Sequence, residues 1–98
     1  MAESGETELK ENIQIIRMNV DNNGFTPSSF ILKEGVPVKW IINGIQITGC
    51  TNEIIVPEYN ISKKLTLGEN IIEFTPTKSG NVSFSCWMGM VRGTFIVE

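Results

Sequence analysis

The 98-residue chain contains no histidine, no run rich in Lys or Arg and no long apolar stretch. Imidazole is the ligand that most readily binds Cu(II), Zn(II) and Ni(II), so a chain without histidine lacks the best donor for those ions. With a net charge of -3 and no basic run, the chain lacks the electrostatic features of a nucleic-acid-binding protein. A transmembrane helix needs about 20 apolar residues. The chain as written is therefore expected to be soluble, with no nucleic-acid partner.

Catalytic residues in a recognisable arrangement are lacking as well. Without histidine there is no imidazole base, and no Ser or Cys nucleophile stands in a motif beside a partner. Paired carboxylates in a recognisable motif are absent too. We therefore expect a binding protein rather than an enzyme.

The length allows one hydrophobic core, and hence one domain. Residues 1–11 are polar and acidic, with almost no β-branched or aromatic side chain. They are predicted to be a flexible lead-in or linker rather than a signal peptide, and residues 12–98 to be the folded domain. A longer natural protein, attached to a membrane through a segment absent from this chain, is compatible with this composition.

From residue 13 onward the chain is a succession of short β-rich runs separated by turn residues, and no segment keeps a 3.6-residue apolar period. Strands are predicted at residues 13–20, 30–33, 36–42, 53–56, 61–67, 70–75, 81–87 and 94–97. Seven or eight short strands in fewer than 100 residues bury their apolar faces by stacking two sheets. The predicted fold class is all-β, either a β-sandwich or a small Greek-key barrel.

Three sulfur side chains fall within five positions, in the segment Cys86-Trp87-Met88-Gly89-Met90. Thiolate and thioether sulfur are soft donors that favour Cu(I). Strand alternation puts Cys86 on the inward face at the end of its strand, together with Val82 and Phe84. Gly89 permits a turn tight enough for both thioethers to point back toward the Cys86 sulfur. Cu(I) is therefore the first ligand to expect.

Other interpretations of these residues stay open. Cys50 and Cys86 could form a disulfide in an oxidising compartment, which would leave a metal-free module. Met88 and Met90 could be core filler under a hairpin, although a short glycine-containing turn is a poor place for it. Zinc would need two more ligands, and no Asp or Glu lies within residues 86–90.

Two further side chains have an expected place. Trp87 could cap a bound ion through a cation–π contact, but alternation points its ring to the opposite face and favours a packing or surface role. Met18, in the middle of a strand among alternating apolar residues, is predicted to belong to the core.

Two stretches together resemble the cupredoxin fold, the β-sandwich of blue copper proteins. The first covers residues 25–43 and reads FTPSSFILKEGVPVKWIIN. The second covers residues 68–76, GENIIEFTP, and continues with Gly80, the segment FSC at 84–86 and GTFIV at 93–97. The resemblance extends over nearly all of the chain beyond the lead-in and implies a Greek-key sandwich.

The chain departs from the blue-copper pattern at the ligands. Cys50 stands near the position of the first cupredoxin histidine, Cys86 matches the ligand cysteine, and Met88 replaces the loop histidine ahead of Met90. A blue-copper centre holds its ion with two imidazoles and a thiolate. The substitution therefore argues against electron transfer and for a site of two cysteines and two methionines that holds Cu(I) without redox cycling.

This all-sulfur set is similar to the Cu(I)-binding cupredoxin domains of bacterial copper resistance. Those domains occur in membrane-anchored copper chaperones, at the N-terminus of copper-exporting P-type ATPases and fused to heavy-metal transporters. The resemblance implies one or two Cu(I) ions per chain: one held by Cys50 and Cys86, the second bridged by Cys86 and completed by Met88 and Met90. Implied partners are a copper transporter, an exporter ATPase or a copper chaperone.

Overall fold

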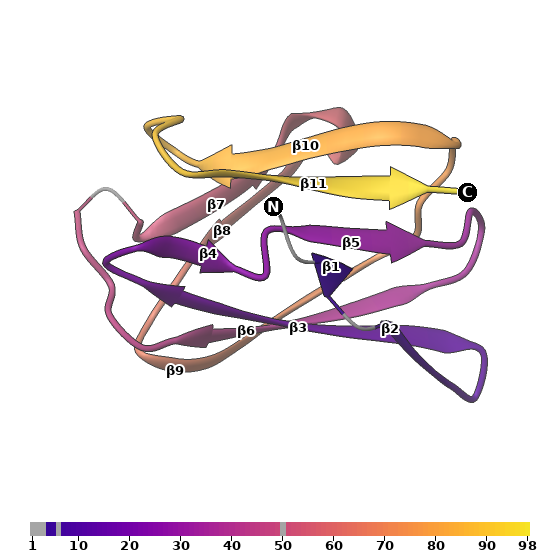
Figure 1. Cartoon of the computed structure of the whole chain (residues 1–98), viewed down its shortest axis with the longest axis horizontal. Coiled ribbons are helices and arrows are strands. Elements are labelled where there is room, and N and C mark those ends of the chain that lie inside the picture. Colours follow the sequence, from indigo (N-terminus) through magenta and orange to yellow (C-terminus); the bar gives the residue numbers. More distant parts are fainter. Residues whose placement is uncertain (1–3, 6, 50) are drawn as a thin grey trace.

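The structure is a computed structural model that describes residues 4–5, 7–49 and 51–98 (Figure 1). These residues form eleven strands and one short 3-10 helix. The elements in chain order are β1 (Ser4–Gly5), β2 (Thr7–Lys10), β3 (Ile13–Asp21), β4 (Gly24–Thr26), β5 (Ser29–Leu32), β6 (Val38–Gly44), β7 (Glu53–Val56), η1 (Pro57–Tyr59), β8 (Ile61–Lys64), β9 (Gly68–Phe74), β10 (Gly80–Cys86) and β11 (Arg92–Val97).

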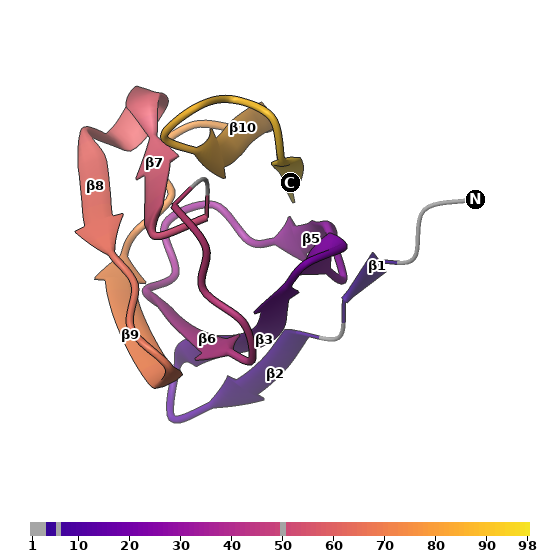
Figure 2. The same cartoon turned by 90° about the vertical axis from the view of Figure 1, so that its left-hand side faces the viewer.

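The strands form two sheets that face each other across the core (Figure 2). The first has the order β1-β5-β11-β10-β7-β8, with β5 and β11 parallel and β10 antiparallel to both β11 and β7. The second has the order β2-β3-β6-β9, with β4 paired to β3, and its central pair β3 and β6 is parallel. The predicted all-β sandwich is confirmed.

Alternation of side chains explains why these runs pair as sheets. β3, β6 and β10 each bury every second residue and expose or half-expose those between. The two inner faces meet around the fully buried ring of Trp40, which makes edge contacts with Phe84 and Phe95 at centroid separations of 4.8 and 5.0 Å. Met18 is 1% exposed, so its prediction as a core residue is confirmed.

Each of the eight predicted runs overlaps an observed strand, and β1, β2 and β4 are additional. Residues 7–10, which lie within the predicted lead-in, form β2, which pairs antiparallel with the start of β3. All four β2 side chains are exposed, so the strand depends on backbone hydrogen bonds rather than on apolar alternation. Composition therefore gave no signal for it.

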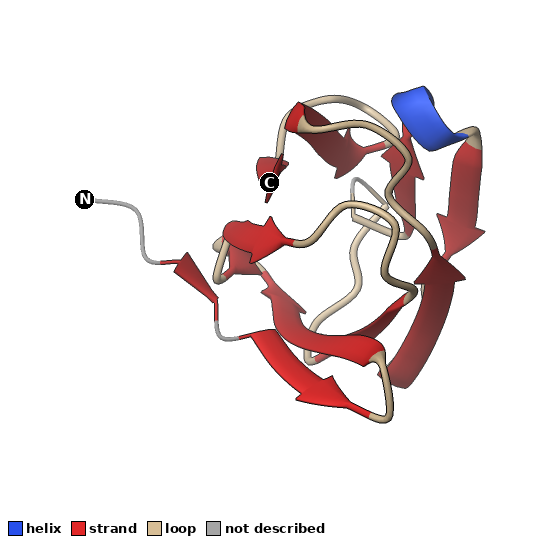
Figure 3. Cartoon of the chain, turned by 90° about the vertical axis from the view of Figure 1, so that its right-hand side faces the viewer, coloured by secondary structure: helices blue, strands red, loops and turns tan. Residues whose placement is uncertain are grey.

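The short helix η1 and the edge strand β1 lie on opposite sides of the molecule (Figure 3). Within the described part of the chain, no helix has the length and apolar character needed to cross a bilayer.

Buried amides fix two connections between strands. The Gln14 side chain donates to the carbonyls of Lys33 and Val36, both at 3.0 Å, and accepts from the Lys33 amide at 2.7 Å. The Asn70 side chain likewise donates to the carbonyls of Thr66 and Gly68, at 2.9 and 3.1 Å. These bonds satisfy loop carbonyls that would otherwise be costly to bury.

Candidate metal centre

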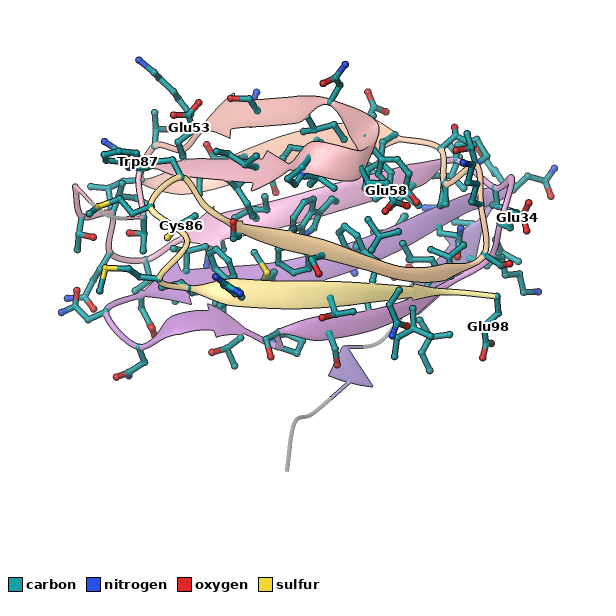
Figure 4. All side chains as sticks on the ribbon, turned by 90° about the horizontal axis from the view of Figure 1, so that it is seen from above. Glu34, Glu53, Glu58, Cys86, Trp87 and Glu98 are labelled. Carbon is teal, nitrogen blue, oxygen red and sulfur yellow. The ribbon has the colours of Figure 1, made fainter. Side chains whose placement is uncertain are left out.

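The sulfur-bearing segment lies at one end of the sandwich. Cys86 is the last residue of β10, is 1% exposed and pairs in register with Ile54 of β7. Its side chain lies at the same end as those of Trp87 and Glu53, whereas Glu34 and Glu98 lie at the opposite end (Figure 4). The inward orientation predicted for Cys86 from strand alternation is therefore confirmed.

Residues 86–91 form a turn closed by the backbone of Cys86. The Gly89 amide donates to the Cys86 carbonyl at 2.9 Å, and the Cys86 amide donates to the Val91 carbonyl at 2.9 Å. Gly89 has a φ of +72°, a left-handed conformation in which a residue with a Cβ would be strained. The turn therefore needs glycine at position 89, between the two methionines.

The same turn directs a hydrogen-bond donor at sulfur. The Val91 amide lies 3.4 Å from the Cys86 Sγ atom. Sulfur is a weak acceptor when neutral, and a donor aimed at it stabilises negative charge on the atom. Val91 itself packs against the core, and Arg92 donates from Nε to the Gly89 carbonyl at 3.0 Å. The turn is thus stabilised by the Val91 amide at the Cys86 sulfur and by the Arg92 side chain at the Gly89 carbonyl.

Met88 and Met90 occupy the exposed part of this turn. Their side chains are 51% and 74% exposed, in contrast to Met18 in the core. The interpretation of both residues as core filler is therefore wrong. Two exposed thioethers in the turn that follows a buried cysteine leave apolar area in contact with water without a packing role.

The second predicted cysteine belongs to the loop between β6 and β7. Cys50 lies outside the described residues, so its prediction as a ligand and the alternative disulfide with Cys86 both stay predictions. The residues flanking it form a compact turn. The Thr51 amide donates to Thr48 Oγ1 at 3.2 Å, the Thr48 amide donates to Thr51 Oγ1 at 3.0 Å, and Thr51 is buried.

Trp87 connects the two cysteine-bearing loops. Its backbone amide donates to the Glu53 carbonyl at 3.0 Å, and its indole Nε1 donates to the Gly49 carbonyl at 2.9 Å. Trp87 is 49% exposed, and its predicted packing or surface role, as opposed to a cation–π cap on a bound ion, stays a prediction. Sequence analysis missed this tie, because the two residues are 38 positions apart and only the fold brings the loops together.

Among residues 4–5, 7–49 and 51–98, no three side chains of the types His, Cys, Asp and Glu come together as a metal-binding group. The sulfur donors that the described residues bring to this end of the sandwich are the Cys86 thiol and the thioethers of Met88 and Met90. Soft sulfur donors of this kind suit Cu(I) better than they suit Zn(II) or Mg(II).

A family model for the cupredoxin-like domain matches residues 1–97. The metal-binding domain of the Streptococcus pneumoniae D39 Cu(I)-exporting P-type ATPase CopA, solved with Cu(I), is similar at 30% identity, with a TM-score of 0.93 over 100% of this chain and 98% of that chain. The solution structure of a copper-binding protein in its apo form is similar at 32% identity, with a TM-score of 0.89 over 100% and 98% of the two chains.

More distant structures share the fold. Auracyanin from the photosynthetic bacterium Roseiflexus castenholzii, in its reduced form, is 18% identical and covers 90% of this chain and 98% of that chain, with a TM-score of 0.68. At this identity the likeness shows the fold alone. No match is found among curated proteins.

Proposed function

Since the chain belongs to the cupredoxin-like family, we propose that it binds Cu(I) through Cys50, Cys86, Met88 and Met90 and exchanges it with a partner in copper trafficking, export or resistance. The observation that carries this proposal is the turn at the end of β10. There a buried cysteine with an amide aimed at its sulfur is followed by two exposed methionines. Core packing does not account for their exposure, and Cu(I) coordination does.

The proposed site holds two ions of unequal affinity. Thiolates of Cys50 and Cys86 bind the first, and Cys86 bridges to a second that is completed by Met88 and Met90. Thiolates are charged donors, whereas thioethers are neutral and bind more weakly, so the second ion exchanges more readily. Two proposed ligands at 51% and 74% exposure also lie where a second protein can reach them.

Two further exposed apolar side chains lie at this end of the sandwich. Ile45 follows β6 and is 50% exposed, and Leu67 precedes Gly68, which pairs with Gly44 at the end of β6. Exposed apolar side chains at the end that carries a metal site favour brief contact with a partner. We propose that the partner is a copper transporter, an exporter ATPase or a copper chaperone, and that the natural protein works near a membrane.

The proposal is of a binding and transfer protein without catalytic activity. A metal-free interaction module with a Cys50–Cys86 disulfide is the alternative function. A count of free thiols distinguishes the copper site from the disulfide-linked module. It uses a thiol-reactive dye on protein purified without any reductant. Two reactive thiols per chain after denaturation support the copper site, and none supports the module.

The direct test is an anaerobic titration of the fully reduced chain with Cu(I) in competition with a coloured Cu(I) chelator. Two ions per chain with unequal affinities would agree with the proposed site. A single ion would reduce it to a simple thiolate site, and no bound ion would leave the disulfide-linked module as the better account.

A further inference from the structure

We propose that Trp87 is a positioning residue for the Cu(I) site, whose indole N–H holds the backbone beside Cys50 close to Cys86 before copper arrives. This inference rests on the proposed Cu(I) site. It goes beyond that site because Trp87 supplies no sulfur, and because the feature that carries it is a hydrogen bond between two loops.

The accepting oxygen has a particular place in the chain. The Gly49 carbonyl, which accepts from Trp87 Nε1 at 2.9 Å, belongs to the peptide group that joins residue 49 to residue 50. A peptide group is planar and rigid. The Trp87 bond therefore fixes the carbonyl end of the peptide group that precedes Cys50 in the chain.

The donating ring is itself anchored. Trp87 directly follows Cys86, and its backbone amide donates to the Glu53 carbonyl at 3.0 Å, so the pairing of β10 with β7 continues one residue past the cysteine. The position of the indole is thus tied to the strand that ends in Cys86. A single side chain links the backbone next to one proposed thiolate with the backbone next to the other.

Packing gives the Gly49 backbone little support. Gly49 is exposed, and a Cβ built on it would meet no atom within 4 Å. The reciprocal bonds of Thr48 and Thr51 shape the turn internally, whereas the Trp87 bond joins it to the end of β10. Without the indole donor, we expect this turn to spend more of its time away from β10.

This arrangement predicts a specific effect on affinity. When only a fraction of molecules is competent to bind, the apparent dissociation constant rises by the inverse of that fraction. A net hydrogen bond of ordinary strength corresponds to a change of about three- to tenfold in that fraction. The apparent dissociation constant should rise only for the ion that is held by both thiolates. The ion held by Cys86, Met88 and Met90 does not depend on where the Cys50 loop lies.

The test compares Trp87→Phe with wild type in the anaerobic Cu(I) competition titration. Phenylalanine keeps an aromatic ring but has no N–H group to donate a hydrogen bond. Because Trp87 is 49% exposed, we expect the variant to fold. The tight ion should bind about three- to tenfold more weakly and the weak ion should be unchanged. In a Cys50→Ser background, Trp87→Phe should have no further effect on the remaining ion.

Trp40→Phe is the matched control, since the chain has two tryptophans. Trp40 is fully buried, and its indole nitrogen has no hydrogen-bond partner among the described residues. Its replacement removes an indole N–H without breaking a bond between the loops. It should lower the midpoint of thermal unfolding and leave the ratio of the two Cu(I) affinities at the wild-type value.

A second readout needs no copper. In the apo, reduced protein the Trp87 indole N–H should exchange with solvent more slowly than a free indole, as followed by NMR. Fast exchange, or a Trp87→Phe variant that binds both ions like wild type or weakens both equally, would overturn the inference alone. Wild-type protein that binds no Cu(I) would overturn the proposed function and this inference with it.

Discussion

Gly93 of β11 lies directly opposite Phe84 of β10, and the Phe84 ring occupies the space that a Cβ at position 93 would need. The same Cβ would also come within 2.6 Å of the Ser28 carbonyl oxygen. Only one further pair, Ser85 with Arg92, separates this contact from the turn that carries the methionines. Close packing of a glycine against a phenylalanine therefore fixes the register at which Cys86 enters its turn.

Gly93→Ala should destabilise the protein by about 3 kcal/mol, because neither the buried ring nor the carbonyl can move aside without disturbing the core. Chemical denaturation of the apo protein measures the change. Gly49→Ala is the control, since no atom lies within 4 Å of its Cβ, and should change stability by less than about 0.5 kcal/mol. A Gly93→Ala protein as stable as the control would contradict the steric argument.

Cys86→Ser should abolish binding of both Cu(I) ions, because the proposed site uses this thiolate in each of them. A hydroxyl is a harder and weaker donor for Cu(I) than a thiolate. The Cu(I) competition titration counts the ions that remain. Ser85→Ala, at the neighbouring position on the other face of β10, should keep both ions. Retention of two ions by Cys86→Ser would rule out the bridge.

Met88→Ala and Met90→Ala should each lose the weaker ion and keep the tighter one. Both side chains are exposed, so the free energy of unfolding should change by less than about 0.5 kcal/mol.

Met18→Ala is the matched control for these variants. Its thioether is buried in the core, so it should lose about 2 to 5 kcal/mol of stability and still bind two ions. The prediction fails if the exposed methionines can be removed without loss of an ion.

Tyr59, the single tyrosine of the chain, should ionise at a higher pH than a free tyrosine. Burial raises its pKa above 10.0 by disfavouring the charged form, and the nearby Glu58 carboxylate raises the pKa further. The pKa is higher in the folded than in the unfolded protein. The contribution of protonated Tyr59 to the free energy of unfolding is therefore fully present below about pH 10 and is lost as the pH rises through the folded pKa.

An alkaline titration followed by the ultraviolet absorbance of tyrosinate checks this prediction, with denatured protein as the reference. Equal midpoints in the two states would contradict it. Tyr59→Phe should remove this part of the alkaline loss of stability. The Tyr59 hydroxyl is buried without a hydrogen-bond partner among the described residues, so the variant should be at least as stable as wild type at neutral pH.

The approximate positions of the main strands along the chain could be predicted from the sequence, because alternation of apolar and polar side chains is a local property. The inward side of Cys86 and the core place of Met18 follow from that alternation and are confirmed. β2 could not be predicted, because its side chains are exposed and it is held by backbone bonds to β3.

The sequence by itself determined the fold class, the soft sulfur donors and the glycine turn that presents them, since composition and short spacing carry that information. Tertiary structure decided that Met88 and Met90 lie in solvent, that the Val91 amide faces the Cys86 sulfur, and that Trp87 bonds to the peptide beside Cys50. The Trp87 contact joins residues 38 positions apart. No local pattern encodes such a contact, because it exists only once β7 has paired with β10 and brought the loop before β7 beside the end of β10.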